Sequence, residues 1–101
     1  MTIRLLEPAQ RELDEAAAWY ADQAPGLGDA FLIEAVRVFR LIEGHPQAWN
    51  PIAVNIRRCR FSRFPYAAVY APEDEGILVV AIAHLHRKPE YWRDRLRALP
   101  D

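Results

Sequence analysis

Residues 55–92, NIRRCRFSRFPYAAVYAPEDEGILVVAIAHLHRKPEYW, decide the fold. They contain an apolar hairpin in which residues 63–71 and 77–83 are predicted strands, and the proline and glycine of residues 72–76 supply the geometry of the turn between them. The unbroken apolar run of residues 77–83 is typical of a central strand that is buried on both faces. Residues 53–61 are more polar, so they predict an edge strand or a strand with one buried face. The segment therefore predicts three consecutive strands of one sheet.

Two helices are predicted upstream of this segment. A weakly alternating first strand at residues 2–7 leads to Pro8, which suits the first turn of a helix. From there apolar residues recur at spacings of three and four, which predicts an amphipathic helix of about four turns. The proline and glycines of residues 25–28 end it, and a second helix is predicted at residues 29–43, with Gly44 left-handed after its end. So short a connection makes the two helices antiparallel neighbours.

A last helix predicted at residues 89–99 completes the order β-α-α-β-β-β-α. This order predicts an α+β fold of two layers, in which the antiparallel helical hairpin packs on a mainly antiparallel four-stranded sheet. The 101 residues suffice for one such domain, residues 1–101, and not for two. No apolar run reaches the length of a membrane span, and the N-terminus lacks the pattern of a signal peptide, so we expect a cytoplasmic protein.

Charge is distributed unevenly along the chain, although the net charge is only −1. Residues 1–50 carry four arginines against eight acidic residues, whereas residues 51–101 carry eight arginines and one lysine against six acidic residues. The second half is therefore basic, which indicates an anionic partner for that half. An ordinary solvated surface would explain the same charges.

Short phrases spread along the chain occur together in one known family. They combine aromatic residues with Pro-Gly, arginine or histidine, and they are Trp19-Tyr20, Pro25-Gly26-Leu27-Gly28, Ile56-Arg57-Arg58, Arg63-Phe64-Pro65-Tyr66, Val69-Tyr70 and Ala83-His84, followed by Arg87, Tyr91 and Trp92. In this order and spacing they resemble the RelE/ParE superfamily of toxins from bacterial type II toxin–antitoxin modules, and more closely its ParE branch. The resemblance implies the same two-layer fold, and a small toxic protein that a cognate antitoxin neutralises.

Members of this superfamily have one of two different activities, so only the site residues can indicate which activity a given chain has. RelE-like members cleave mRNA on the ribosome by driving a 2′-hydroxyl onto the adjacent phosphate, which requires a base, an acid and cations. ParE-like members poison DNA gyrase and need a binding surface but no strict catalytic set. The lysines that serve RelE-like members on the second strand are absent here, and arginine cannot replace a lysine that must move a proton.

Under the nuclease alternative, His84 and His86 are the candidate catalytic residues, because imidazole exchanges protons near neutral pH. They lie two residues apart at a strand end, so we expect both to project to the same face. Arg63 and Arg87 would then hold the phosphate, and Tyr91 would stack on a base. Equally, the histidines would be ordinary polar residues where a buried strand meets solvent. An H-x-H pair without a third ligand does not predict a metal site.

The predicted binding residues are the cations and one aromatic ring at the two ends of the hairpin. Those predicted to bind the target or a phosphate are Arg57, Arg58, Arg60, Arg63, Arg87 and Tyr91. For the antitoxin we predict Trp19, which lies off the apolar face of its helix, together with Arg58 and Arg60. Two other interpretations stay open: the arginines protect a sheet edge from pairing, and Tyr91 with Trp92 simply docks the last helix.

Three functions follow from these alternatives. The first is a gyrase inhibitor without intrinsic catalysis, and the second is a metal-independent, ribosome-dependent mRNA endoribonuclease. The third is a family member that has lost toxicity and still binds its antitoxin. We expect no cofactor, because arginines stabilise phosphate charge directly and the chain lacks the carboxylate cluster that magnesium prefers. Nor do we expect sequence-specific DNA binding without the antitoxin.

Overall fold

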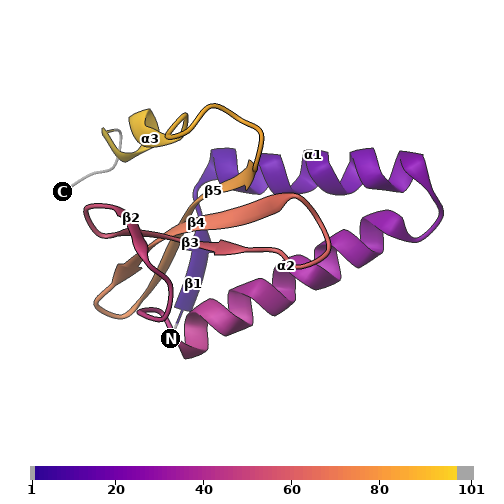
Figure 1. Ribbon diagram of the computed structural model, residues 1–101. Coiled ribbons are helices and arrows are strands. Elements are labelled where there is room, and N and C mark those ends of the chain that lie inside the picture. The colour runs from indigo at the N-terminus through magenta and orange to yellow at the C-terminus, as the bar shows by residue number, and fades with distance from the viewer. Residues whose placement is uncertain (1, 98–101) are drawn as a thin grey trace.

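The computed structural model describes residues 2–97, which form three helices and five strands (Figure 1). In chain order the elements are β1 (Thr2–Leu5), α1 (Glu7–Gln23), α2 (Leu27–Gly44), β2 (Pro51–Ala53), β3 (Ile56–Arg60), β4 (Tyr66–Glu73), β5 (Gly76–His84) and α3 (Arg93–Arg97). None of the helices in residues 2–97 is apolar and long enough to cross a membrane.

The strands form one sheet in the order β1-β5-β4-β3-β2. Strand β1 pairs in parallel with β5, and the other three pairs of neighbours are antiparallel. The predicted α+β class and the mainly antiparallel sheet are therefore confirmed. The sheet has five strands rather than four, because a turn at Val54 and Asn55 divides the strand predicted at residues 53–61. Asn55 has φ 56°, a left-handed conformation that asparagine tolerates better than most residues.

Several predicted boundaries were wrong by a few residues. Strand β4 begins at Tyr66 instead of residue 63, because residues 62–65 form the turn that follows β3. The last helix spans only Arg93–Arg97, since residues 89–92 form turns, and its predicted end at residues 98–99 lies outside the described residues. Gly44 is the last residue of α2 and is not left-handed. The glycine with positive φ is Gly26, at 79°, immediately before α2.

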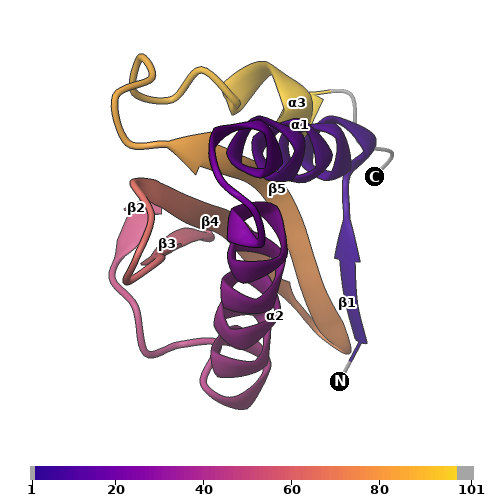
Figure 2. The same ribbon diagram turned by 90° about the vertical axis from the view of Figure 1, so that its right-hand side faces the viewer.

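Helices α1 and α2 cover one face of the sheet (Figure 2). Their apolar faces pack with side chains of β3, β4 and β5 in one core cluster, which is centred on Phe31 and the neighbouring rings of Tyr20 and Phe64. The two helices approach closely at Gly28, where a Cβ atom would lie 2.7 Å from the carbonyl oxygen of Ala17. Any larger residue at position 28 would force the helical hairpin apart.

The opposite face of the sheet carries a second core cluster. Leu78, Val80 and Ala83 of β5 pack there with the buried ring of Trp92. Strand β5 is therefore buried on both faces, as its apolar run predicts. Tyr91 and Leu96 pack against the same cluster, which fits the interpretation that Tyr91 and Trp92 dock the last helix.

Candidate functional site

Strand β5 loses its neighbour half-way along its length, and side chains replace the missing strand. Strand β1 pairs only as far as Val79. Beyond that point a β-bulge brings Val80 and Ala81 to the same face. The backbone N–H of Ile82 then donates to Glu12 of α1 at 3.1 Å, and Arg95 of α3 donates to the carbonyl oxygen of Val80 at 3.0 Å. These two bonds occupy part of an edge that would otherwise be open to another strand.

Glu12, Tyr91 and Arg95 form a cluster that ties α1 to the C-terminal segment. Arg95 donates to both carboxylate oxygens of Glu12 at 2.8 Å, and the hydroxyl of Tyr91 donates to Oε2 at 2.6 Å. Burial raises the pKa of Glu12, but the hydrogen bonds from Arg95 and Tyr91 outweigh it, so that the net pKa is lowered. Burial, and then the bond to the Glu12 carboxylate, raises the pKa of Tyr91. The cluster fixes the loop between β5 and α3, which carries the predicted site residues His86, Arg87 and Tyr91.

An open groove lies between that loop and β3, on the sheet face opposite the helical hairpin. It contains a cavity of about 310 Å³ between Arg58, Arg87 and Lys88, and an adjoining one of about 340 Å³ beside Arg58 and Arg60. The four cations are exposed, and no carboxylate in residues 2–97 pairs with any of them. We call this the cationic groove. It offers charge and hydrogen-bond donors to an anionic partner.

His84 lines the cationic groove, and His86 lies next to His84. Strand β5 ends at His84 and His86 falls in the following turn, so the expectation that both project from one strand face was wrong. Their rings are nevertheless 5.0 Å apart. The backbone N–H of His86 donates to Nδ1 of His84 at 3.0 Å, so this nitrogen is not free to take a proton from a substrate.

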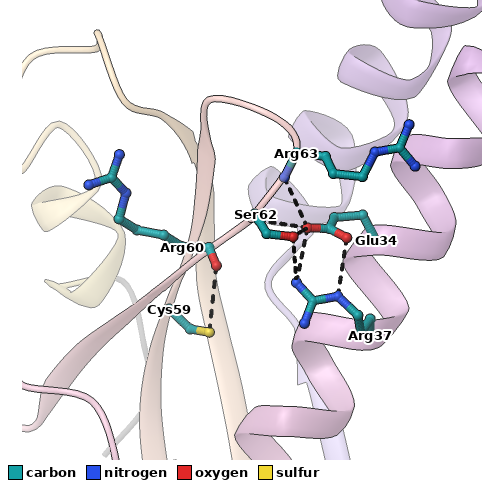
Figure 3. Close-up of polar contacts among 6 residues, drawn as sticks. All are labelled: Glu34, Arg37, Cys59, Arg60, Ser62 and Arg63. Carbon is teal, nitrogen blue, oxygen red and sulfur yellow. Dashed lines mark hydrogen bonds and ion pairs between the residues drawn. The ribbon is translucent and has the colours of Figure 1, made fainter.

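The five predicted arginines do not converge on one point. Arg57 donates to the carbonyl oxygen of Trp49 and to Oε1 of Gln47, so it holds the loop that precedes β2. Arg63 points away from Arg60 across the turn after β3, and it lines neither of the cavities that include His84 (Figure 3).

Tyr91 already has a stacking partner. The guanidinium of Arg87 lies 4.0 Å from the centre of the Tyr91 ring. The hydroxyl of Tyr91 donates to Glu12. The predicted nuclease set of His84, His86, Arg63, Arg87 and Tyr91 is therefore not assembled around one cavity. Arg58, Arg60 and Arg87 are the predicted arginines that the structure does bring to a shared surface.

Trp19 lines a second hollow, of about 550 Å³, between α1 and the end of β5. The indole is 58% exposed, whereas Tyr20 packs against the core, so the prediction that Trp19 lies off the buried face is confirmed. Arg58 and Arg60 do not line this hollow. His84 and Arg87 line both the hollow and the cationic groove, so the two sites are contiguous.

Sequence reasoning missed a second exposed surface, which we call the outer face of α2. Its apolar residues are Leu32, Ile33, Val36 and Leu41, and Ile33 is 70% exposed. They line a hollow of about 630 Å³ together with Arg37 and Arg40. The signal was present in the sequence, since these apolar residues fall outside the buried face of the helix. Clustered exposed apolar residues of this kind mark a contact site for another protein.

Residues 3–89 match the family model described as the ParE toxin of type II toxin–antitoxin system, parDE. The chain belongs to the ParE toxin family. The predicted resemblance to the RelE/ParE superfamily, and to its ParE branch, is thereby confirmed. The match includes the helical hairpin and all five strands, and it ends before Tyr91 and α3.

One solved structure has a similar fold. It is described as the chromosomal ParDE TA system from P. aeruginosa, and one of its chains superposes with a TM-score of 0.73 at 16% sequence identity. The superposition covers 85% of this chain and 97% of the other. No match was found among curated proteins.

Proposed function

We propose that this ParE family member arrests growth by binding DNA gyrase in the cytoplasm, and that a cognate antitoxin neutralises it. The observation that carries the proposal is the cationic groove, where Arg58, Arg60 and Arg87 are exposed and unpaired within residues 2–97. Arginine keeps its charge at any working pH and offers a rigid fork of donors, which suits binding to acidic side chains rather than proton transfer.

The arrangement of the histidines supports binding over catalysis. A ribonuclease of the RelE kind needs a base beside the attacking hydroxyl and cations around the same phosphate. Here Nδ1 of His84 accepts a backbone hydrogen bond, and Arg63 lies outside the cavities that include His84. The cations of the groove therefore serve best as a contact surface for the proposed target.

The antitoxin has two surfaces available, and we propose that it uses both. An extended segment in the hollow beside Trp19 would pass His84 and Arg87 and reach Arg58, because these two residues line both depressions. The outer face of α2 fits the apolar side of an amphipathic helix. Acidic residues on that helix would face Arg40, which is exposed and has no carboxylate partner within residues 2–97.

The test is inhibition of DNA supercoiling by purified gyrase. We expect the wild-type protein to block supercoiling, and the Arg58→Ala/Arg60→Ala variant to require at least about tenfold more protein, the equivalent of about 1.4 kcal/mol of binding free energy. Arg11→Ala is the matched control, since Arg11 is exposed on α1 and pairs only with the neighbouring Glu7. Normal supercoiling with excess folded wild-type protein would refute gyrase as the target.

One observation favours the mRNA endoribonuclease as a second candidate. Lys88, which is not on a strand, lines the cationic groove with His84 and Arg87 and supplies a lysine, which the second strand lacks. If this candidate is correct, expression yields transcripts cut inside codons, and both His84→Ala/His86→Ala and Lys88→Ala abolish the cuts while the fold survives. Uncut transcripts in growth-arrested cells would exclude it.

A further inference from the structure

Glu34 is a carboxylate in an unusual place. It lies on the buried side of α2 between Phe31 and Val38, and it is 6% exposed. Within residues 2–97 it is the only charged residue that is buried. A buried carboxylate is costly unless it is paired and hydrogen-bonded, so its partners indicate what it is for.

Those partners belong to the turn between β3 and β4 (Figure 3). Oε1 of Glu34 accepts from the backbone N–H of Ser62 at 2.6 Å, from the Ser62 hydroxyl at 2.7 Å and from the backbone N–H of Arg63 at 3.3 Å. Arg37, one helical turn further along, donates to both carboxylate oxygens and also to the Ser62 hydroxyl. The amides of Ser62 and Arg63 and the Ser62 hydroxyl therefore all meet the same carboxylate.

This turn is the place where two of the candidate binding arginines leave the sheet. Arg60 is the last residue of β3 and Arg63 is the second residue of the turn, and Figure 3 shows their guanidinium groups on opposite sides of the chain. Neither side chain has a carboxylate partner in residues 2–97 that would hold it in place. Their directions therefore depend on the backbone of the turn. That backbone is anchored to α2 through one carboxylate.

We propose that Glu34 is the positioning residue of the Arg60–Arg63 turn. It holds the Ser62 and Arg63 amides against α2, so that Arg60 faces the cationic groove and Arg63 faces the helical hairpin. Where target binding is measured, this inference rests on the proposed function. The anchoring itself does not, because it concerns only contacts within the chain.

The experiment compares Glu34→Gln with Glu43→Gln, a change of the same chemistry on the same helix at a residue whose side chain forms no hydrogen bond within residues 2–97. Amide hydrogen exchange is measured in the free protein, and gyrase binding and antitoxin binding are measured beside it. For Glu34→Gln we expect exchange at the Ser62 and Arg63 amides to accelerate at least about tenfold more than exchange at the amides of β5. Gyrase binding should weaken as much as in Arg60→Ala, and antitoxin binding through α2 should not weaken, because Arg37 on that face keeps its charge.

Unchanged exchange at Ser62 and Arg63 would overturn the inference, and so would an equal acceleration across the whole sheet, which would mark a merely structural residue. Ser62→Ala provides a second variant that keeps the Glu34 charge in place. It should accelerate exchange at the turn less than Glu34→Gln does. If wild-type protein fails to bind gyrase while exchange behaves as expected, the proposed target is wrong and the anchoring role of Glu34 stands.

Discussion

The two helices of the hairpin each carry one carboxylate that reaches a segment far away in the sequence. Glu12 of α1 binds the open part of β5 and Arg95 of α3, and Glu34 of α2 binds the turn after β3. Both accept backbone N–H groups that no strand satisfies. Their counterions differ, because Arg95 is 19% exposed, whereas Arg37 is 46% exposed on the outer face of α2.

The two carboxylates therefore hold the segments beside the cationic groove in different ways. The Glu12–Arg95 pair is closed on itself and shields both charges, so it acts as a fixed clamp on the C-terminal segment. Glu34 itself is more deeply buried, but its counterion stays within reach of solvent and of any partner on α2. The comparison therefore predicts that Glu34 contributes more to the free energy of unfolding than the Glu12–Arg95 pair does. It also predicts that substitutions on the outer face of α2 have little effect on stability.

The largest effect is expected from Glu34→Ala. Removing this carboxylate leaves the partly buried N–H of Ser62 and the guanidinium of Arg37 without their acceptor, so we expect the free energy of unfolding to fall by about 2–4 kcal/mol. Urea denaturation measures the loss, with Glu43→Ala as the control on the same helix. A loss no larger than that of the control would show that water or the turn itself satisfies these groups.

A smaller effect is expected from Arg95→Ala. The change removes two bonds to Glu12 and one to the carbonyl oxygen of Val80, but Tyr91 and the N–H of Ile82 still donate to Glu12, so a loss of about 1–2 kcal/mol is expected. The same urea titration gives the value, and Arg97→Ala, whose side chain is exposed, is the control. If Arg95→Ala lowers the free energy of unfolding by more than Glu34→Ala does, the ranking of the two carboxylates is reversed.

The pH dependence of stability sharpens the comparison further. The hydrogen bonds from Arg37 lower the pKa of Glu34 from 4.5 to about 2, although burial acts in the opposite direction. Since the folded-state pKa is depressed, the stabilisation is complete above pH 4.5 and is lost as the pH falls toward 2. Unfolding measured across this window should show a smaller loss for Glu34→Gln than for wild type. Parallel curves for the two proteins would contradict the assignment.

The smallest effect on stability is expected on the outer face of α2. Ile33→Asp/Val36→Asp replaces exposed apolar side chains, so the free energy of unfolding should change by no more than about 1 kcal/mol. Antitoxin binding, measured by calorimetry, should weaken at least about tenfold, because the new carboxylates oppose an acidic, apolar partner helix. Unchanged affinity would remove this face from the proposed antitoxin site.

Most of the fold was predictable, because it depends on local patterns. The period of the apolar residues identified both helices, and the apolar run at 77–83 identified the central strand. The turn at Val54 and Asn55 was missed because neither proline nor glycine marks it. The parallel pairing of β1 with β5 also could not be read from a strand of four residues.

The candidate site was predictable in composition but not in arrangement. The sequence identified the arginines and histidines near the two ends of the hairpin, and it placed Trp19 outside the core. It did not show that Arg57 binds the loop before β2, or that Arg63 lies outside the cavities that include His84. Glu12 and Glu34 entered only the count of acidic residues, because their partners lie up to 83 residues away along the chain and leave no local pattern.

The central claim is that the exposed cations bind gyrase and do not cut RNA. Its most direct test is inducible expression without antitoxin, with plasmid topology and transcript 5′ ends read from the same culture. We predict disturbed plasmid topology with intact transcripts, and the same result for His84→Ala/His86→Ala, whereas Arg58→Ala/Arg60→Ala should restore growth. New 5′ ends inside translated codons, with normal plasmid topology and dependence on the two histidines, would contradict the account.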